Sequence, residues 1–238
     1  MTGRYLVMGA HGGIGEDVAK RLLQDGHSVL ATARDSSSIT VEGAETLSVD
    51  VFQKDQIEQA VSQADRGEGL QGLVYAVGSI NLKPFGKTTD QDYMDTFQLN
   101  FLGAVQVLRA AEEALKKGQG SVVLYSTIAV QQGFPSHAAI ASAKGAIEGL
   151  VRTLAAEWAG KVRVNGIAPS LTDTEIAGPI TGSEQMADTI AKMHPVPRLG
   201  KPEDSGAMSA FLLSEQASWI TGQIMHVDGG RSHVRHKG

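Results

Sequence analysis

Residues 9–15 read Gly9-Ala10-His11-Gly12-Gly13-Ile14-Gly15 and follow a short apolar run, YLVM, at residues 5–8. Glycines at this spacing let the chain turn tightly and let backbone amides approach a pyrophosphate at the start of a helix. A glycine-rich turn that binds nothing is the alternative. The position after a first strand favours a dinucleotide. The cofactor contacts expected from this turn are Gly9, His11, Gly13, Ile14 and Gly15.

The rest of the chain alternates short apolar runs with longer amphipathic stretches. Helical spacing of apolar residues marks the stretches at 14–23, 56–61, 90–117, 138–158 and 202–213. Runs typical of buried strands lie at 5–8, 27–33, 45–49, 73–77, 121–125, 162–167 and 223–227. This alternation predicts βαβ units, and therefore an α/β fold with a parallel sheet covered by helices on both faces. The sequence shows no repeat or linker, so we expect a single domain over residues 1–238.

Two segments fall outside this alternation. Residues 170–200 are of mixed character and contain three prolines, which predicts either a mobile lid over a site or an ordinary surface excursion. The tail, residues 231–238, carries Arg231, Arg235 and Lys237. We expect this tail to be a solvated or disordered end.

Composition excludes several classes of protein. The 238 residues are 42% hydrophobic and carry a net charge of −5, which allows a sizeable core and argues against a general nucleic-acid binder. The absence of cysteine excludes disulfides, thiolate metal ligands and a cysteine nucleophile. The seven histidines form no close ligand pair on a helix, so no metal site is expected. Without a membrane-spanning run or a secretory signal, we expect a soluble cytoplasmic protein with no membrane partner.

The end of the second strand indicates which cofactor binds. Ala33 is followed by Arg34 and Asp35. A carboxylate here would bind the ribose hydroxyls of NAD, whereas an arginine would pair with the 2′-phosphate of NADP. Ala33 with Arg34 favours NADP(H). Asp35 lies about 20 residues past the glycines, as in NAD-binding turns, so NAD(H) is the alternative cofactor. Arg34 could also be a surface charge that binds no cofactor.

Further motifs follow the glycine turn: Asp50-Val51, Ala76-Val77-Gly78, Asn100, Lys144, VRVNGIAPSLTDT at 162–174 and WITGQIMHVDGG at 219–230. In this order and spacing they resemble the short-chain dehydrogenase/reductase family over residues 3–230. The resemblance implies a Rossmann-type, doubly wound sheet of about seven parallel strands in three α/β/α layers. It also implies hydride transfer on a small-molecule substrate and assembly as a dimer or tetramer. The further cofactor contacts it implies are Asp50, Val51, Ala76, Gly78, Lys144, Pro169 and Thr174.

The catalytic residues implied by the resemblance are incomplete. The family places a tyrosine four residues before its active-site lysine, on the same helical face. Here that position is Ile140, before Lys144, and isoleucine cannot donate a proton. Thirteen residues upstream, where the family carries a serine that orients the carbonyl, stands Thr127, preceded by Ser126. The implied catalytic set is Asn100, Ser126 or Thr127, and Lys144, without the usual acid.

Three functions remain open at this point. The first is carbonyl or alcohol chemistry with a substitute proton donor. Candidate donors are Tyr125, Ser126, His137 and a water held by Lys144 and Asn100. The second is reduction of a conjugated C=C, in which charge spreads onto an enolate; the chain is similar to the 2,4-dienoyl-CoA reductases, although the mitochondrial type carries its tyrosine where Ala129 stands here. The third is NADP(H) binding without catalysis, as a sensor or scaffold.

Overall fold

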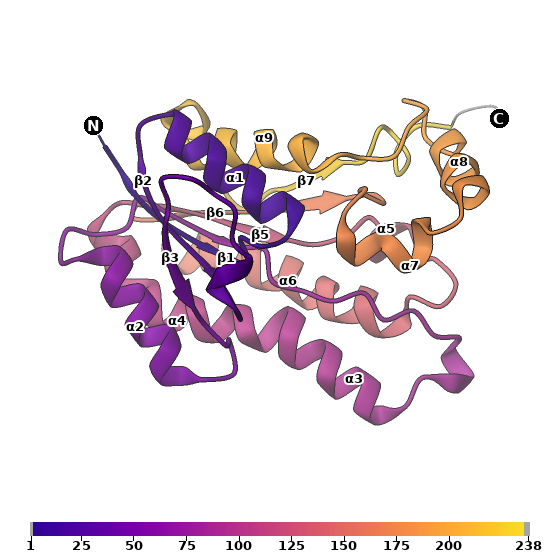
Figure 1. The fold of residues 1–238 in the computed structure, drawn as a ribbon, viewed down its shortest axis with the longest axis horizontal. Coiled ribbons are helices and arrows are strands. Elements are labelled where there is room, and N and C mark those ends of the chain that lie inside the picture. The colour runs from indigo at the N-terminus through magenta and orange to yellow at the C-terminus, as the bar shows by residue number, and fades with distance from the viewer. Residues whose placement is uncertain (1, 236–238) are drawn as a thin grey trace.

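The computed structural model describes residues 2–235 and contains a sheet of seven parallel strands (Figure 1). Neighbouring strands are hydrogen-bonded in the order β3, β2, β1, β4, β5, β6, β7. Their bounds are β1 Arg4–Met8, β2 Ser28–Ala33, β3 Glu45–Ser48, β4 Gly72–Tyr75, β5 Ser121–Tyr125, β6 Arg163–Pro169 and β7 Ile224–Val227. This doubly wound order confirms the predicted Rossmann-type α/β fold.

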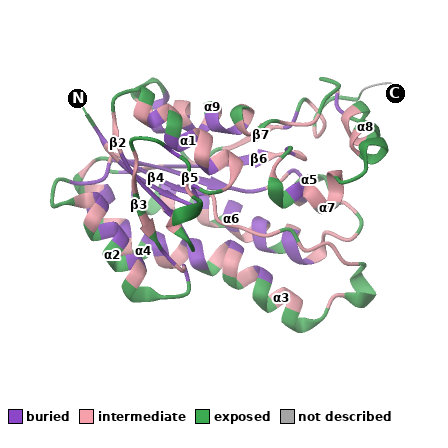
Figure 2. Cartoon of the chain, in the orientation of Figure 1, coloured by how far each residue is buried: buried purple, intermediate pink, exposed green. Residues whose placement is uncertain are grey.

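Helices cover both faces of the sheet, which gives the three expected layers (Figure 1). On one face α1 (Gly13–Gln24) packs beside α9 (Pro202–Leu213). The other face is covered by α2 (Lys54–Asp65), α4 (Gly103–Lys117) and α6 (Ala138–Glu157). Most of these helices bury one side and expose the other (Figure 2), because their apolar residues recur at helical spacing. Within residues 2–235, none of the helices combines the length and the apolar composition needed to cross a bilayer.

The five inner strands, β2, β1, β4, β5 and β6, are buried on both faces, which explains their continuous apolar runs. In β1, Leu6 and Met8 belong to the core packed against α2, α4 and α6. Tyr5 and Val7, which alternate with them, belong to the core packed against α1 and α9. A register slip of one residue would exchange the two sets. The sheet is therefore held in one register by both of its helical layers.

The long helix predicted over residues 90–117 is present and contains a π-helical turn that was not predicted. It runs without a break through α3 (Asp90–Phe97), the π-helical turn (Gln98–Leu102) and α4. At the end of β4, the Tyr75 hydroxyl donates a hydrogen bond to the carbonyl oxygen of Leu99 in this turn, 2.8 Å away. Such turns are frequent at functional sites, and this one carries the asparagine of the implied catalytic set.

Residues 170–200 form a compact excursion from the end of β6. The excursion contains two short helices, α7 (Gly178–Thr181) and α8 (Glu184–Lys192). A parallel bridge between Thr172 and Gly200 joins its two ends. Another short helix, α5 (Ala129–Gln132), lies between β5 and α6.

Candidate active site

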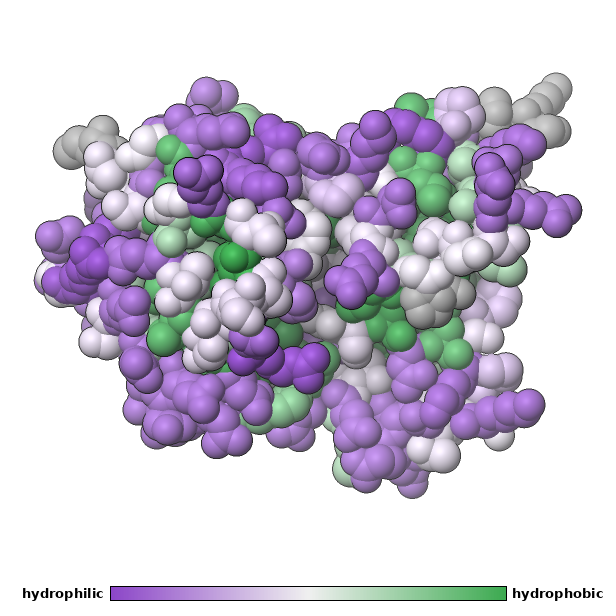
Figure 3. Space-filling view, in the orientation of Figure 1, coloured by the Kyte–Doolittle hydropathy of each residue, from purple (hydrophilic) through white to green (hydrophobic). Residues whose placement is uncertain are grey.

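The chain reverses its strand order between β1 and β4, and ligands of such folds bind at the carboxyl ends of the strands beside this reversal. Two adjoining cavities lie there. The glycine cavity, about 690 Å³, is lined by the glycine turn and the end of β2; the lysine cavity, about 420 Å³, is lined by Lys144 and apolar residues around it. Residues 76–79, Ile14, Thr174 and Ile176 border both. Figure 3 shows the molecule hollowed on this face, with hydrophobic side chains gathered beside the hollow.

Every residue predicted for the site lines at least one of these cavities. The glycine cavity is lined by Gly9, His11, Gly13, Gly15, Arg34, Asp50 and Val51. The lysine cavity is lined by Asn100, Ser126, Thr127, Ile140, Lys144 and Pro169. The residues that line both are Ile14, Ala76, Gly78 and Thr174.

The glycine turn packs closely against the first two strands. Gly9 has a φ of 86°, a left-handed conformation that favours glycine. The amides of Gly9 and Ala10 both donate to the carbonyl oxygen of Thr32 at 2.9 Å. Helix α1 begins within the glycine turn, at Gly13, which lines the glycine cavity. The amides of its first turn, which have no partner within the helix, are therefore available to an anion in the glycine cavity.

The close packing of this turn depends on Gly15. A methyl group at Gly15 would overlap the carbonyl group of Gly9. We expect Gly15→Ala to lower the free energy of unfolding by about 1–3 kcal/mol, the usual cost of overpacking, as measured by urea denaturation. Gly12→Ala is the matched control, because its Cβ would lie 3.8 Å from the nearest atom and its φ is −87°. Equal stability of the two variants would contradict this packing argument.

The end of β2 presents Arg34, and not Asp35, to the glycine cavity. Asp35 instead accepts hydrogen bonds from the hydroxyl and the amide of Ser37, at 2.7 and 2.9 Å. These bonds hold the pKa of Asp35 below its ordinary value. The charge that β2 brings to the cavity is therefore the exposed cation of Arg34.

Helix α6 places Ile140 and Lys144 in the wall of the lysine cavity, one turn apart on one face. Lys144 is only 9% exposed and Ile140 only 6%. Among the described residues, none accepts a hydrogen bond from Lys144 Nζ. Burial lowers the pKa of Lys144 to about 8. A buried amine with free donors and this pKa can bind a polar ligand and exchange a proton near neutral pH.

Asn100 and Lys144 meet beside Gly78. A Cβ at Gly78 would lie 2.8 Å from Asn100 Oδ1 and 3.6 Å from Lys144 Nζ. Asn100 Nδ2 donates to the carbonyl oxygen of Thr96 at 3.0 Å and to Ser79 Oγ at 3.3 Å, and Oδ1 accepts from the Ser79 amide at 3.3 Å. Asn100 therefore anchors the loop after β4, and its Oδ1 keeps one lone pair for a ligand or a water.

The two hydroxyls after β5 have different partners. Ser126 donates to Glu148 Oε1 at 2.9 Å in the buried interior. Glu148 also pairs with Arg152, 3.2 Å away. Thr127 accepts from the amide of Ala129 at 3.3 Å and donates to no described residue, which leaves its proton available to a ligand. Thr127 is thus better placed than Ser126 to hydrogen-bond a substrate oxygen.

Two of the expected substitute donors have other hydrogen-bond partners. The Tyr125 hydroxyl pairs with Ser209 on α9 at 2.5 Å, and burial raises the pKa of Tyr125 far above its ordinary value. His137 lines the lysine cavity with its Nδ1 2.7 Å from the carbonyl oxygen of Pro135. A carbonyl only accepts, so the proton sits on Nδ1 and Nε2 donates only when the ring carries both protons. Tyr125 therefore lines the lysine cavity with its hydroxyl already paired to Ser209, and the single ring proton of His137 is donated to Pro135.

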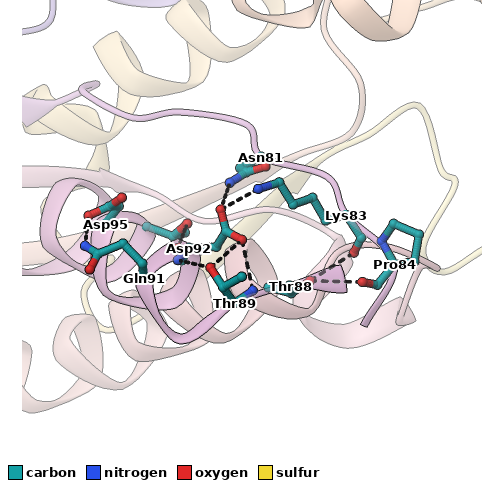
Figure 4. A network of polar contacts seen from close by, with 9 residues as sticks. Asn81, Lys83, Pro84, Thr88, Thr89, Gln91, Asp92 and Asp95 are labelled. Atoms are coloured by element: carbon teal, nitrogen blue, oxygen red, sulfur yellow. Dashed lines mark hydrogen bonds and ion pairs between the residues drawn. The ribbon is translucent and has the colours of Figure 1, made fainter. Parts of the chain in front are cut away.

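A polar network fixes the loop between β4 and α3 (Figure 4). Asp92 accepts from Lys83 Nζ at 2.6 Å and from the amide of Thr89 at 2.9 Å. The Thr89 hydroxyl in turn accepts from the Asp92 amide at 3.2 Å and caps α3. The bond from Lys83 and those from Thr89 hold the pKa of Asp92 below its ordinary value. The loop carries Ile80 and Leu82 into the wall of the lysine cavity, so the network fixes one apolar side of it.

Comparison with known proteins agrees with this geometry. A family profile described as Enoyl-(Acyl carrier protein) reductase matches residues 9–232. An uncharacterized oxidoreductase of Methylorubrum extorquens is 34% identical over 243 residues, which cover 94% of this chain and 96% of that protein. A short-chain type dehydrogenase/reductase from Mycobacterium ulcerans superposes with a TM-score of 0.90 and 31% identity, over 99% of this chain and 92% of that one. The chain belongs to the short-chain dehydrogenase/reductase family.

Similarity to a further solved structure extends to a complex with cofactor. This short-chain dehydrogenase/reductase superposes on ElxO with NADP bound with a TM-score of 0.89 and 27% identity, over 97% of this chain and 99% of ElxO. The nucleotide-binding fold of the family is therefore present over its full length here.

One cation of the lysine cavity was not predicted from the sequence of this short-chain dehydrogenase/reductase. Arg231, expected in a solvated or disordered tail, lines the cavity, so that expectation was wrong. Gly229 and Gly230, with φ of 60° and 87°, turn the chain back after β7. The Asp-Gly-Gly sequence of residues 228–230 was the signal that could have predicted this turn. Residues 236–238 of the tail lie outside the described residues.

Proposed function

We propose that this short-chain dehydrogenase/reductase is an NADP(H)-dependent oxidoreductase. It transfers hydride to or from a small carbonyl, alcohol or enoyl substrate, without a phenolic proton donor. The observation that carries the proposal is the junction of the two cavities. A glycine-lined cavity with Arg34 at its rim adjoins an apolar cavity that contains Lys144 and Thr127. A cofactor in the first and a substrate in the second would meet at the wall they share.

The residues of the glycine cavity fit NADP(H). Side chains at Gly9 and Gly15 would collide with backbone, so glycine is needed for the turn to bring the start of α1 to the cavity. The amides in the first turn of α1 have no partner within the helix, which suits a pyrophosphate. Asp50 and Val51 would border the adenine, and Thr174 would border the nicotinamide carboxamide. The free donors of Lys144 would hydrogen-bond the nicotinamide ribose. Bound NADP(H) supplies or accepts the hydride.

Arg34 is proposed to select NADP(H) over NAD(H), because it is the charge that β2 presents to the cavity. We expect Arg34→Ala to weaken NADPH binding by about 1.5–3 kcal/mol, the range for a charge-assisted hydrogen bond, and to leave NADH binding unchanged. Isothermal titration calorimetry with both cofactors measures the difference. Arg109→Ala, at an exposed position outside both cavities, is the control. An unchanged NADPH-to-NADH preference in Arg34→Ala would refute the assignment of cofactor selection to Arg34.

The proton is proposed to pass through Lys144. Its ammonium can exchange a proton with a substrate oxygen directly, or through a water held with Asn100 Oδ1 beside Gly78. Thr127 would hydrogen-bond the same oxygen. Ile140 occupies the wall one turn before Lys144 and supplies no proton. A missing acid costs ~10²–10⁴ in rate, so slow reduction of simple ketones is expected.

A conjugated C=C substrate is the second chemistry that this cavity supports. Hydride addition to it leaves charge on an enolate oxygen, which needs a stabilising contact more than an immediate acid. Thr127 and Lys144 can make such contacts, whereas Ile140 contributes only an apolar surface to the cavity. The partial resemblance to 2,4-dienoyl-CoA reductases favours the same chemistry.

Calorimetry followed by turnover assays tests the proposal. NADPH and NADH are titrated first, and NADPH oxidation is then followed with ketones and α,β-unsaturated thioesters, with alcohols and NADP⁺ in the reverse direction. Saturable binding with turnover supports the oxidoreductase. Binding without turnover across the panel supports a sensor or scaffold that uses the cofactor only as a ligand. No saturation by either cofactor at millimolar concentration would overturn both.

Three further features belong to this proposal. Residues 170–200, joined at their base by the Thr172–Gly200 bridge, would close over the substrate as a lid of a single-domain chain. The chain would assemble as a dimer or tetramer, which light scattering after gel filtration measures. Its place of action would be the cytoplasm.

A further inference from the structure

The charged side chains that line the lysine cavity among the described residues are basic. They are Lys144 and Arg231; the imidazole of His137 lies in the same wall, and no aspartate or glutamate among the described residues lines it. The rest of the wall is largely apolar, with Ile80, Leu82 and Ile190 among its members. A cavity of about 420 Å³ with apolar walls and only basic charges suits an anion with a hydrocarbon part.

Among residues 2–235, Arg231 finds few partners for its five N–H donors. Its guanidinium carbon lies 4.9 Å from the centre of the Phe134 ring, and one of its nitrogens lies 3.5 Å from the sulfur of Met193, a weak acceptor. Within residues 2–235 no carboxylate lies within ion-pair distance of this guanidinium. Burial lowers the pKa of Arg231, yet an arginine stays charged in this setting. The Arg231 guanidinium thus lines the lysine cavity with N–H donors available to a ligand.

The segment that carries Arg231 is held in place. The Asp228 carboxylate accepts from the amides of Gly230 and Ser232, each at 2.8 Å. Gln132 of α5 donates to the carbonyl oxygen of Ser232 at 2.5 Å. Figure 1 shows the yellow segment after β7 running toward α8, and the contact between Arg231 and Met193 places the two side by side. Arg231 is therefore oriented by its backbone, as a recognition residue requires.

We propose that Arg231, stacked on Phe134 beside His137, binds an anionic group of the substrate, so that the substrate class is a carbonyl or enoyl compound bearing a carboxylate or sulfonate. This inference rests on the proposed function for the identity of the reacting group. The planar guanidinium suits such groups because it can donate two parallel hydrogen bonds to two oxygens.

The separation of His137 and Lys144 along α6 indicates the length of such a substrate, because both line the lysine cavity. His137 directly precedes α6 and lies beside Phe134, with the rings 5.5 Å apart, and Ile140 and Lys144 follow one and two turns later. At 1.5 Å rise per residue these positions lie roughly 5–10 Å further along the helix. The anionic group would therefore be separated from the reacting carbon by a short hydrocarbon chain.

Binding of hexanoate and of its neutral counterpart hexanamide tests the site apart from turnover. Both are titrated calorimetrically into the full chain, with and without NADPH, for the parent, Arg231→Met, Arg231→Lys and the control Arg235→Met. Arg235 is exposed and lines neither cavity. We expect the parent and Arg235→Met to prefer hexanoate by roughly 10- to 100-fold, the range for a charge-assisted hydrogen bond. Arg231→Met should lose this preference and Arg231→Lys should keep part of it.

Equal binding of the acid and the amide by the parent would overturn the anion site, and this comparison needs no variant. A preference that survives in Arg231→Met would overturn the assignment to Arg231. Turnover is measured on the same samples with 5-oxohexanoate and its methyl ester. Loss of the hexanoate preference in Arg231→Met, without turnover of any carbonyl or enoyl compound by the parent, would support the anion site and overturn the proposed function instead.

Discussion

Replacement of Ile140 by tyrosine is expected to raise kcat/KM for ketone reduction by up to ~10²–10⁴, the range that a placed general acid supplies. Ile140 lies in the wall of the lysine cavity, so a phenol there would project toward the substrate and not into the core. Lys144 follows one turn later on the same face, and its positive charge would lower the phenol pKa toward neutral pH. The gain is measured as the rate of NADPH oxidation with a series of small ketones.

Ile140→Phe is the matched control for this gain. It introduces the same ring without the hydroxyl, so it reproduces the change in volume and leaves the proton supply unaltered. A rise in Ile140→Tyr that is absent in Ile140→Phe would identify the missing proton donor as the cause of slow turnover. Equal rates in the two variants, with an active parent, would indicate that another donor or C=C chemistry is used.

Replacement of Lys144 by methionine is expected to abolish turnover, with a loss of at least ~10². The same change should stabilise the chain without cofactor. Burial lowers the pKa of Lys144 from 10.5 to about 8, so the charged form is disfavoured in the folded state by about 3 kcal/mol. This cost is fully present below pH 8 and disappears as the pH rises past 10.5, where the unfolded chain also loses the proton. Methionine removes the charge and keeps the apolar volume.

Urea denaturation of the parent and Lys144→Met at pH 7 and above pH 10.5 measures this difference. We expect the variant to be more stable at pH 7, and the gap to shrink at the higher pH. Lys161→Met, at an exposed position, should change neither stability nor turnover appreciably. Unchanged activity in Lys144→Met would remove Lys144 from the mechanism, and a pH-independent gap would contradict its buried charge.

The alternation of strands and helices could be predicted because each element has its own local periodicity of apolar residues. Strand β1 is apolar from Tyr5 to Met8 because helices cover both faces of the sheet. The π-helical turn within the helix over 90–117 was not predictable in this way. Its Leu99 carbonyl oxygen accepts a hydrogen bond from Tyr75, 24 residues away in sequence, and contacts between residues so far apart do not appear in local periodicity.

The glycine turn was also predicted from residues that are neighbours in sequence. Lys144 and the tyrosine position at Ile140 were identified through the family resemblance, and helical spacing then predicted that the two share one face.

The sequence by itself determined the layered α/β fold, the glycine turn beside a helix start, and the absence of a phenol at Ile140. Each of these features depends on residues that are close together in the chain. Tertiary structure alone decided the partners of the hydroxyls and cations. It turned Ser126 to Glu148, paired Tyr125 with Ser209, and brought Arg231 from the tail to Phe134. The physical reason is that burial and hydrogen bonding act between groups close in space, and chain folding, not spacing along the sequence, determines which groups those are.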